Sequence, residues 1–147
     1  MRAVIQRVKE ARVEVKGKIV ASIGPGLLVL LGIAQADTSV DIPWMVDKIV
    51  HLRIFEREDG KFDSSVLDVR GELLLVSQFT LYGDCSKGRR PSFSQAMGAE
   101  EARALFQLFV EKAREKALRV ESGIFQAHMD VSLINEGPVT IILDSKS

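Results

Sequence analysis

Alternation between apolar and polar residues opens the chain and predicts strands. Three short valine-rich segments, residues 2–8, 12–16 and 19–23, show this pattern in part, and Gly17-Lys18 provides a turn before the last of them. Residues 24–26 (Gly-Pro-Gly) then interrupt the pattern, and residues 27–33 follow as an apolar run without alternation. Such a run predicts a strand covered on both faces, so we expect it in the core.

Helical spacing of apolar residues marks two later segments. The first runs from Ile42 to about Arg53, and Asp41 or a residue a few positions earlier is expected to cap it, because Pro43 fits only in a first turn. The second lies between residues 102 and 117, with acidic residues before it and basic residues near its end, as the helix dipole favours. Its apolar face consists of Ala102, Leu105, Phe106, Phe109, Val110, Ala113 and Ala117.

Further strands are expected between and after these helices. Residues 72–81 have the pattern of a buried strand, and residues 129–134 and 139–143 that of a closing pair. Strands at both ends of the chain with helices inserted between them indicate an α+β fold with mostly antiparallel sheets and two main helices. A doubly wound parallel sheet is not expected.

Composition narrows the class of protein. The 147 residues include 46% hydrophobic and 27% charged residues, which predicts a single globular domain over residues 1–147. The 20 basic and 20 acidic residues cancel, so the broad positive field of a non-specific duplex binder is not expected. A nucleic-acid partner would have to be met by a local group of residues.

Localisation, metal and cofactor expectations follow from what the sequence offers. The opening residues MRAVIQRV have no signal-peptide pattern and residues 26–34 are too short an apolar run to span a bilayer, so we expect a cytoplasmic protein without a membrane partner. Cys85, His51 and His128 cannot form a closed zinc site, so neither metal nor cofactor is expected, although a site made of carboxylates stays open as an alternative.

The first candidate site is the sequence Ser77-Gln78-Phe79-Thr80, where an apolar strand ends in polar side chains and an aromatic ring. Strand ends are where a rigid scaffold presents side chains and spare amides to a ligand. The alternative is that the two hydroxyls satisfy local backbone groups and that the ring belongs to the core.

The second candidate is the sequence NEGPVT at residues 135–140. Because proline lacks an amide hydrogen and its preceding bond can be cis, Gly137-Pro138 can form a corner that turns carbonyl oxygens outward. The alternative is an ordinary hairpin turn between two strands.

The third candidate is the basic loop of residues 87–93, which suits phosphate or a terminal nucleotide but could equally be a solvated loop. Cys85 is a weaker candidate, because a lone cysteine is more often a small hydrophobe than a nucleophile. His51 follows Asp47 by one helical turn and is expected to pair with it, and His128 could line a pocket beside Met129. No recognisable nucleophile motif accompanies either histidine, so a Ser-His-Asp triad has little support.

Five stretches together resemble the D-aminoacyl-tRNA deacylase family. They occur in the order MRAVIQRV, RIFEREDGKF, LLLVSQFTLYGD, GRRPSF and NEGPVT, and the resemblance extends from Met1 to about Leu143. It implies a barrel-like core and a cytoplasmic homodimer with active sites at the subunit interface. It also implies hydrolysis of the ester between a D-amino acid, or glycine mischarged on tRNA-Ala, and the 3′ terminus of tRNA. Asp63, where the family often has asparagine, and Tyr82-Gly83 depart from the pattern.

The resemblance also implies roles for individual residues. The carbonyls of Gly137 and Pro138, joined by a cis bond and inserted from one subunit into the other, would hold the α-amino group and exclude an L side chain. Four residues would surround the ester: Ser77, Gln78, Phe79 and Thr80. Backbone amides near Gln78 and Phe79 would stabilise the oxyanion, and the ribose 2′-hydroxyl would help to activate water.

The remaining implied roles concern the tRNA end. Arg7 would lie near the Gly-Pro corner, and Phe125 with Met129 would enclose the terminal adenine. Thr80 would position the substrate, and Lys87, Arg89 and Arg90 would supply a local grip on the tRNA terminus.

Two other functions fit the same residues. One is a hydrolase of small esters or amides that uses Thr80 or Ser77 as a covalent nucleophile. The other is a non-enzymatic nucleic-acid module, in which the basic loop binds strands and the Gly-Pro corner is only a turn.

Overall fold

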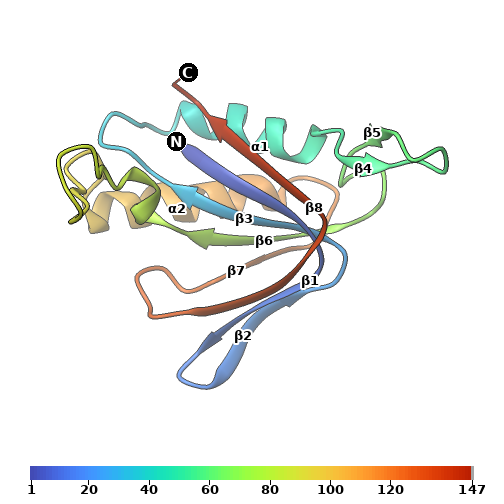
Figure 1. Ribbon diagram of the computed structural model, residues 1–147, viewed down its shortest axis with the longest axis horizontal. Helices are drawn as coiled ribbons and strands as arrows, with labels where there is room; N and C mark the ends of the chain where they lie inside the picture. Colours follow the sequence, from blue (N-terminus) through green and yellow to red (C-terminus); the bar gives the residue numbers. More distant parts are fainter. Residues whose placement is uncertain (147) are drawn as a thin grey trace.

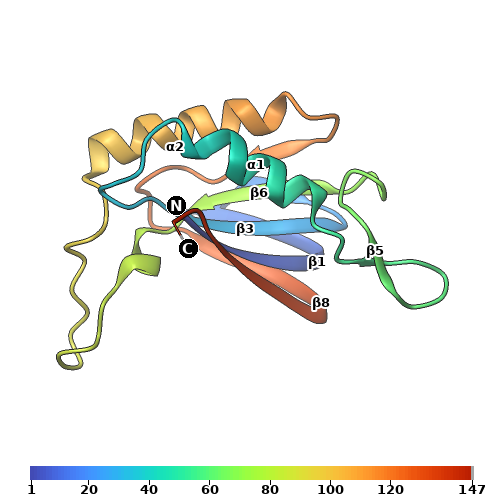
Figure 2. The same ribbon diagram turned by 90° about the horizontal axis from the view of Figure 1, so that it is seen from above.

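A strongly curved sheet with two helices on one face forms the molecule (Figures 1 and 2). The computed structural model describes residues 1–146. The strands follow the order β2-β1-β3-β6-β7, in which β2 and β3 pair with different halves of the long strand β1. Strand β8 pairs with the remaining edge of β1. Its strands are β1 (Arg2–Val15), β2 (Lys18–Ile23), β3 (Gly26–Gly32), β6 (Glu72–Ser77), β7 (Val120–Ser122) and β8 (Asp130–Asp144).

The remaining elements connect these strands. Helix α1 (Asp41–His51) and a small hairpin of β4 (Phe55–Glu56) and β5 (Phe62–Ser64) lie between β3 and β6. The 3₁₀ helix η1 (Phe79–Tyr82) and helix α2 (Ala99–Arg114) lie between β6 and β7. Among residues 1–146, no helix is long and apolar enough to cross a membrane.

The sheet is mixed, which corrects the expectation of mostly antiparallel pairing. Strand β6 runs parallel to both β3 and β7, whereas β1 is antiparallel to β2, β3 and β8. The parallel pairs arise because a helix crosses over between β3 and β6 and another between β6 and β7. The unbroken apolar runs of β3 and β6 fit this arrangement, since parallel strands are covered on both faces. The expected α+β class with two main helices and a nearly closed, barrel-like sheet is confirmed.

Strands β1 and β8 are long and bent, and each was expected as two strands. One edge of β1 pairs with β3 over its first half and with β2 over its second, while β8 follows the opposite edge along both halves. The predicted closing pair is therefore wrong: residues 129–134 and 139–143 belong to one strand and share the partner β1. The bend allows a single strand to serve both halves of the curled sheet (Figure 1).

Two apolar clusters fill the two faces of the sheet. Helices α1 and α2 cover one face, where Met45, Ile49 and Phe109 pack against β1, β3 and β6. On the other face, the second half of β1 curls with β2 over Leu28, Leu74 and Val76. The curl closes the second core without further helices.

Several element ends differ from the sequence prediction. Val40, one position before Asp41 and within the predicted range, caps α1, but its side chain has no acceptor for a capping bond. The Asp41 carboxylate instead accepts a hydrogen bond from the Thr38 amide in the preceding turn. Helix α2 begins and ends three residues earlier than its apolar stripe suggested. The strand predicted over residues 72–81 ends at Ser77, and η1 follows it. The short strands β4, β5 and β7 were not predicted.

Candidate active site

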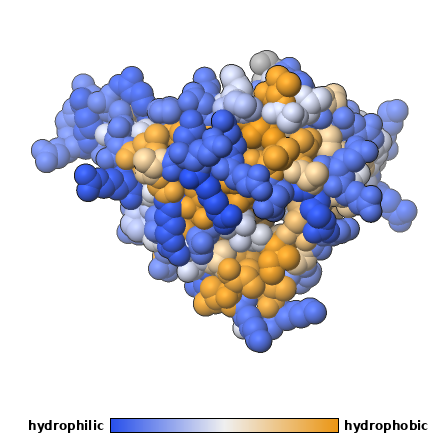
Figure 3. All heavy atoms as spheres, turned by 180° about the vertical axis from the view of Figure 1, so that it is seen from behind, coloured by the Kyte–Doolittle hydropathy of each residue, from blue (hydrophilic) through white to orange (hydrophobic). Residues whose placement is uncertain are grey.

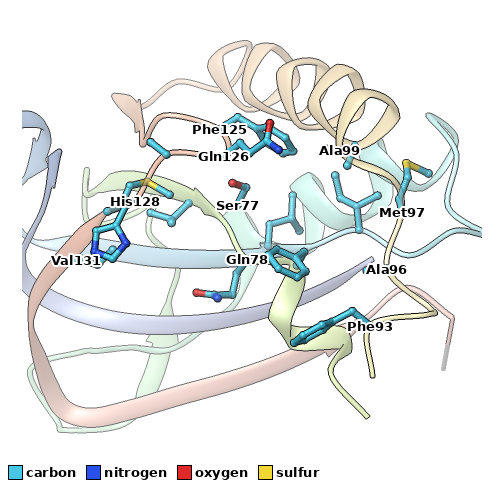
Figure 4. A pocket seen from close by; sticks show the side chains of 17 residues that line it. Ser77, Gln78, Phe93, Ala96, Met97, Ala99, Phe125, Gln126, His128 and Val131 are labelled. Carbon is cyan, nitrogen blue, oxygen red and sulfur yellow. The ribbon is translucent and has the colours of Figure 1, made fainter. Parts of the chain in front are cut away.

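A pocket of about 560 Å³ opens where β3 and β6 end, beside the first turn of α2. Its apolar lining comes from β3, α2 and the two segments that follow η1 and β7, and its polar lining includes Ser77, Gln78, Gln126 and His128. Figure 4 shows Phe125 and Gln126 close to helix α2, with Phe93 on the opposite side. A concave, mostly apolar site with a few polar groups is the usual form of a small-ligand site.

The end of β6 brings the first candidate sequence into this pocket. The amide of Gln78 donates a hydrogen bond to the carbonyl of Leu31 at 2.8 Å, which extends the pairing of β6 with β3 by one residue. The chain then turns into η1, and the Gln78 side-chain amide donates to Thr80 Oγ1. Within residues 1–146, the amides of Phe79 and Thr80 have no hydrogen-bond acceptor. The free backbone donors are therefore those of Phe79 and Thr80, not that of Gln78.

Phe79 and Phe93 form the outer wall of the pocket. Their rings lie 5.1 Å apart in an edge-to-face arrangement, and the Phe79 side chain is 57% exposed. The chain after Phe93 is fixed to the end of β3, because the Met97 amide donates to the carbonyl of Ile33 at 3.0 Å. Phe79 thus belongs to the pocket rim and not to the core.

The segment after β7 forms the opposite wall with Phe125, His128 and Met129. Helix α2 holds this segment: Arg103 Nη2 donates to Gln126 Oε1 at 3.0 Å, and the Arg103 guanidinium carbon lies 4.9 Å from the centre of the Phe125 ring. Gln126 has φ +68°, a left-handed conformation that is uncommon for a residue with a side chain. Phe125 and Met129, for which the family resemblance implied a binding role, both line the pocket.

The Gly-Pro corner is a bulge in β8, not a hairpin turn. Gln6 of β1 pairs with Thr140 and Val8 pairs with Asn135, so residues 136–139 of β8 lie opposite the single residue Arg7. The bond between Gly137 and Pro138 is cis, and both residues are exposed.

Arg7 holds the corner through hydrogen bonds to backbone carbonyls. Its buried guanidinium donates to the carbonyl of Glu136 at 3.2 Å and to the carbonyl of Ile54 at 2.9 Å. The Glu56 carboxylate lies 3.4 Å from Nη2, and the Phe62 ring centre lies 5.6 Å from the guanidinium carbon. Arg7 therefore joins the bulge to the β4-β5 hairpin.

Side chains at both ends of the bulge also join. The amide of Asn135 donates to Gln6 Oε1 at 2.5 Å, and Asn135 Oδ1 accepts a hydrogen bond from the Val139 amide at 3.0 Å. Thr140 Oγ1 donates to the same Gln6 oxygen. These bonds fix where the bulge leaves and rejoins the strand.

The corner and the pocket lie near opposite ends of β3. Arg7 pairs with Leu27, whereas Leu31, beside Ser77, pairs with Ala3, four residues further along β1. At ~3.3 Å per residue this is a separation of roughly 13 Å along the strand. Neither Gly137 nor Pro138 lines the pocket of its own chain.

The other sequence candidates lie outside this pocket. Lys87, Arg89 and Arg90 are exposed in a loop that the paired residues Asp84 and Ser92 close at its base. Cys85 is exposed and unpaired by a disulfide. His51 pairs with Asp47 at 3.2 Å on the surface of α1, as expected. Within the part of the chain that the structure describes, no group of three or more metal-ligating side chains occurs.

The sequence did not single out several residues of the pocket. Ala99 and Ala102 reach it from α2, and Met97 and Phe93 from the segment before that helix. Small alanines on an apolar helix face and a lone methionine carry no distinguishing signal. Phe93 was noted only as the aromatic residue behind the basic loop.

Comparison with known proteins identifies the relatives of this chain. A family model described as D-Tyr-tRNA(Tyr) deacylase matches residues 4–144. The D-aminoacyl-tRNA deacylase of Thermosipho africanus (strain TCF52B) is 58% identical over 146 residues, covering 99% of this chain and 98% of the relative. The protein of the same description from Clostridium kluyveri is 57% identical with the same coverage.

Solved structures agree in fold. The c-Myc DNA Unwinding Element Binding Protein superimposes with a TM-score of 0.92 at 44% identity, and each chain is covered to 98%. A structure described as a probable eukaryotic D-amino acid tRNA deacylase gives a TM-score of 0.84 at 22% identity, with 97% of each chain covered. The second likeness concerns the fold alone.

Proposed function

Because the chain belongs to the D-Tyr-tRNA(Tyr) deacylase family, we propose that it hydrolyses the carboxylic ester of a D-aminoacyl-tRNA and releases the free D-amino acid and the tRNA. The observation that carries this proposal is the pocket in which Ser77, Gln78 and Phe79 face Phe125 and Met129. Such a pocket suits the end of a single strand, whose last base can stack on an aromatic or thioether side chain. We place this activity in the cytoplasm.

The reacting ester lies at the Ser77 end of the pocket. A water molecule adds to the ester carbonyl, and the unpartnered amides of Phe79 and Thr80 stabilise the resulting oxyanion. The carbon–oxygen bond to the ribose then breaks, and the ribose oxygen takes up a proton. Oriented donors of this kind contribute ~3 kcal/mol each, which suits an ester that is already activated. The neighbouring 2′-hydroxyl assists the water, and Thr80, held by Gln78, positions the substrate.

Selection of the D enantiomer falls to the Gly-Pro corner. The carbonyl oxygens of Gly137 and Pro138 accept hydrogen bonds from the substrate's α-ammonium, and the corner occupies the space that an L side chain would need. Glycine, which has no side chain, also fits, so glycyl-tRNA-Ala is a second substrate. A clash built against the competing enantiomer is one of the two ways in which a site gains specificity.

The corner acts in the pocket of a second copy of the chain. Within one chain it lies roughly 13 Å along the sheet from Ser77, so it cannot meet its own ester. Exposed apolar side chains support a homodimer, since such patches are typical of interfaces. Leu133, Ile134 and Ile142 of β8 are 37%, 49% and 68% exposed, and Figure 3 shows apolar side chains gathered at the end of the molecule that bears the β1–β2 hairpin.

The basic loop grips the tRNA beyond its terminal nucleotide. Lys87, Arg89 and Arg90 are exposed on a loop next to the pocket wall formed by Phe93. With zero formal net charge, the protein has only such local groups for phosphates. Recognition is then confined to the acceptor end of the tRNA.

The deciding experiment compares D-Tyr-tRNA with L-Tyr-tRNA as substrates of the purified protein. We expect rapid loss of the D ester and no loss of the L ester beyond the spontaneous rate. Equal hydrolysis of both esters would contradict the role of the corner. If neither ester is cleaved while single strands still bind, the non-enzymatic nucleic-acid module would be favoured, a function that the name of the c-Myc DNA Unwinding Element Binding Protein also suggests.

Thr80→Ala separates the proposal from covalent catalysis. We expect the rate to fall without being abolished, since the substrate's own hydroxyl takes part. Complete loss of activity in a folded variant, together with acylation of Thr80 in the wild type, would favour the covalent hydrolase. The same comparison with Ser77→Ala tests the other candidate nucleophile, and single-turnover rates provide the measurement.

A further inference from the structure

Arg2 joins three segments of the chain beside the pocket. Its Nη1 donates to the carbonyl of Leu81 in η1 at 3.1 Å. Its Nε and Nη2 lie 3.0 and 2.9 Å from Asp144 Oδ2 at the end of β8, and its guanidinium carbon lies 4.9 Å from the centre of the Tyr82 ring. One side chain at the start of β1 thus contacts the last two residues of η1.

The same end of η1 also packs on β3, and Tyr82 is buried there. Its underside rests on Gly32, where an added Cβ would lie 3.1 Å from Leu81 Cβ and from Tyr82 Cε2. Burial raises the pKa of the Tyr82 phenol to about 12, with nearby Asp37 and Asp144 acting in the same direction. The ring that faces Arg2 is therefore neutral at physiological pH, and it offers its face to the cation.

The turn that Arg2 holds is the one that begins with Phe79 and Thr80. With only four residues, η1 moves as one unit, so a displaced Leu81 displaces the amides at the other end. The Gly83 amide bonds back to the Thr80 carbonyl at 2.9 Å, which makes the turn a closed structure. Its orientation over the pocket depends on what anchors Leu81 and Tyr82.

We propose that Arg2 is a positioning residue for the deacylation: through Leu81 and Tyr82 it sets the orientation of η1 and thereby the place of the Phe79 and Thr80 amides over the ester. The inference rests on the proposed function. Adenosine binding by Phe125 and Met129 takes place on the opposite wall, so loss of Arg2 changes the rate of the chemical step and not substrate affinity. A misplacement of ~1 Å at a reacting centre can cost about 100-fold in rate.

The test compares Arg2→Met and Arg2→Lys with the matched control Arg119→Met, using D-Tyr-tRNA. Arg119 also has two carboxylate partners, Glu72 at 3.1 Å and Glu121 at 3.4 Å, but it lies near the opposite end of β6. For Arg2→Met we expect kcat to fall about tenfold with KM within about twofold of the wild type. Arg2→Lys recovers part of kcat, because it keeps a cation beside Asp144 but lacks the planar fork. Arg119→Met retains both constants.

Amide hydrogen exchange gives a readout that does not depend on activity. We expect faster exchange at the Leu81 and Gly83 amides in Arg2→Met and unchanged exchange in α1. An unchanged kcat in Arg2→Met, or a change confined to KM, would overturn the inference. A wild-type protein that leaves D-Tyr-tRNA intact would instead overturn the proposed function. Should Arg2→Met not fold, a wild-type kcat in Arg2→Lys together with unchanged exchange at Gly83 would equally contradict the role of Arg2.

Discussion

Gly137 is the residue at which one added methyl group should matter most. Its φ of +124° is a backbone conformation that L side chains rarely adopt, and a Cβ there would lie 2.8 Å from Val139 Cγ2 and 3.1 Å from Arg7 Nη2. The clash falls first on the Val139 side chain within the bulge and then on Arg7, which supports it, so the corner would shift. We expect Gly137→Ala to lower kcat/KM for D-Tyr-tRNA about 100-fold or more.

The control for this change is Gly60→Ala in the loop between β4 and β5. Gly60 also has a positive φ, +78°, but nothing lies within 4 Å of its added Cβ. Backbone strain of ~1–3 kcal/mol therefore applies to both variants, whereas crowding applies only to the first. Melting temperatures that fall in both variants, with activity lost only in Gly137→Ala, would assign the loss to the corner. Full activity in Gly137→Ala would contradict the role of the bulge.

Sequence reasoning reached some of these residues and not others, for a physical reason. Gly137 and Pro138 stand out because few strands contain such a pair, and Arg7 followed from the resemblance. Arg2 and Arg103 look like ordinary exposed arginines of a strand and a helix, and only the fold brings them to Leu81 and Gln126. Likewise, no pattern indicates that the Gln78 amide is used in the sheet and that the next two amides are not.

At the scale of elements, Glu72 ties the turn before β3 to the start of β6. Its carboxylate accepts a hydrogen bond from the Gly24 amide at 2.7 Å and one from Arg119 at 3.1 Å. The hydrogen bond from Gly24, assisted by Arg119 and opposed by partial burial, holds the pKa of Glu72 below its usual value of 4.5. A depressed pKa stabilises the folded state above the usual value, and this contribution disappears as the pH falls through the folded pKa.

We therefore expect Glu72→Gln, which keeps an oxygen acceptor but loses the charge, to lower the free energy of unfolding by about 1 kcal/mol at pH 7. The difference between variant and wild type should shrink as the pH falls below the usual value of 4.5 and through the lower pKa of the folded state. Urea unfolding over this pH range measures it. A difference that stays constant with pH would show that the charge is not involved.

The segment after β7 depends on α2 in a way that a second variant can test. Without Arg103, Gln126 loses its side-chain partner and Phe125 its cation, so the pocket wall that we propose encloses the base should loosen. We expect Arg103→Ala to raise KM for D-Tyr-tRNA about fivefold with kcat within about twofold. Arg114→Ala, an exposed basic residue at the end of the same helix, should change neither constant.

Salt dependence separates this role of Arg103 from direct phosphate binding. A lost phosphate contact would reduce the slope of log KM against log salt concentration by ~0.7. A positioning residue leaves the slope unchanged, so a changed slope would contradict the interpretation.

Elements were predictable where their pattern is local. Helices α1 and α2 and strands β2 and β3 followed from apolar spacing, because a stripe or an unbroken run depends only on near neighbours. The continuity of β8 through Gly137 and Pro138 did not follow, because it depends on β1 as a partner on both sides of the bulge. The direction of β6 was also missed, although its apolar run carried the signal of a strand covered on both faces.

At the scale of the molecule, the sheet separates the two halves of the proposed chemistry. The pocket lies where β3 and β6 end, and the bulge lies beside Arg7 near the start of β3. Under the proposed function, the corner that meets the ester therefore comes from a second copy of the chain.

Subunit mixing tests this arrangement directly. Gly137→Ala impairs the corner, and Ala127→Trp fills the pocket, which Ala127 lines. Each variant alone should retain about 1% of wild-type activity or less. An exchanged 1:1 mixture should recover about one quarter, because half of the dimers are mixed and each mixed dimer has one complete site. Differently tagged chains and native mass spectrometry report the exchange. A mixture that forms mixed dimers and stays inactive would place corner and pocket in the same chain, against the separation that the strand register imposes.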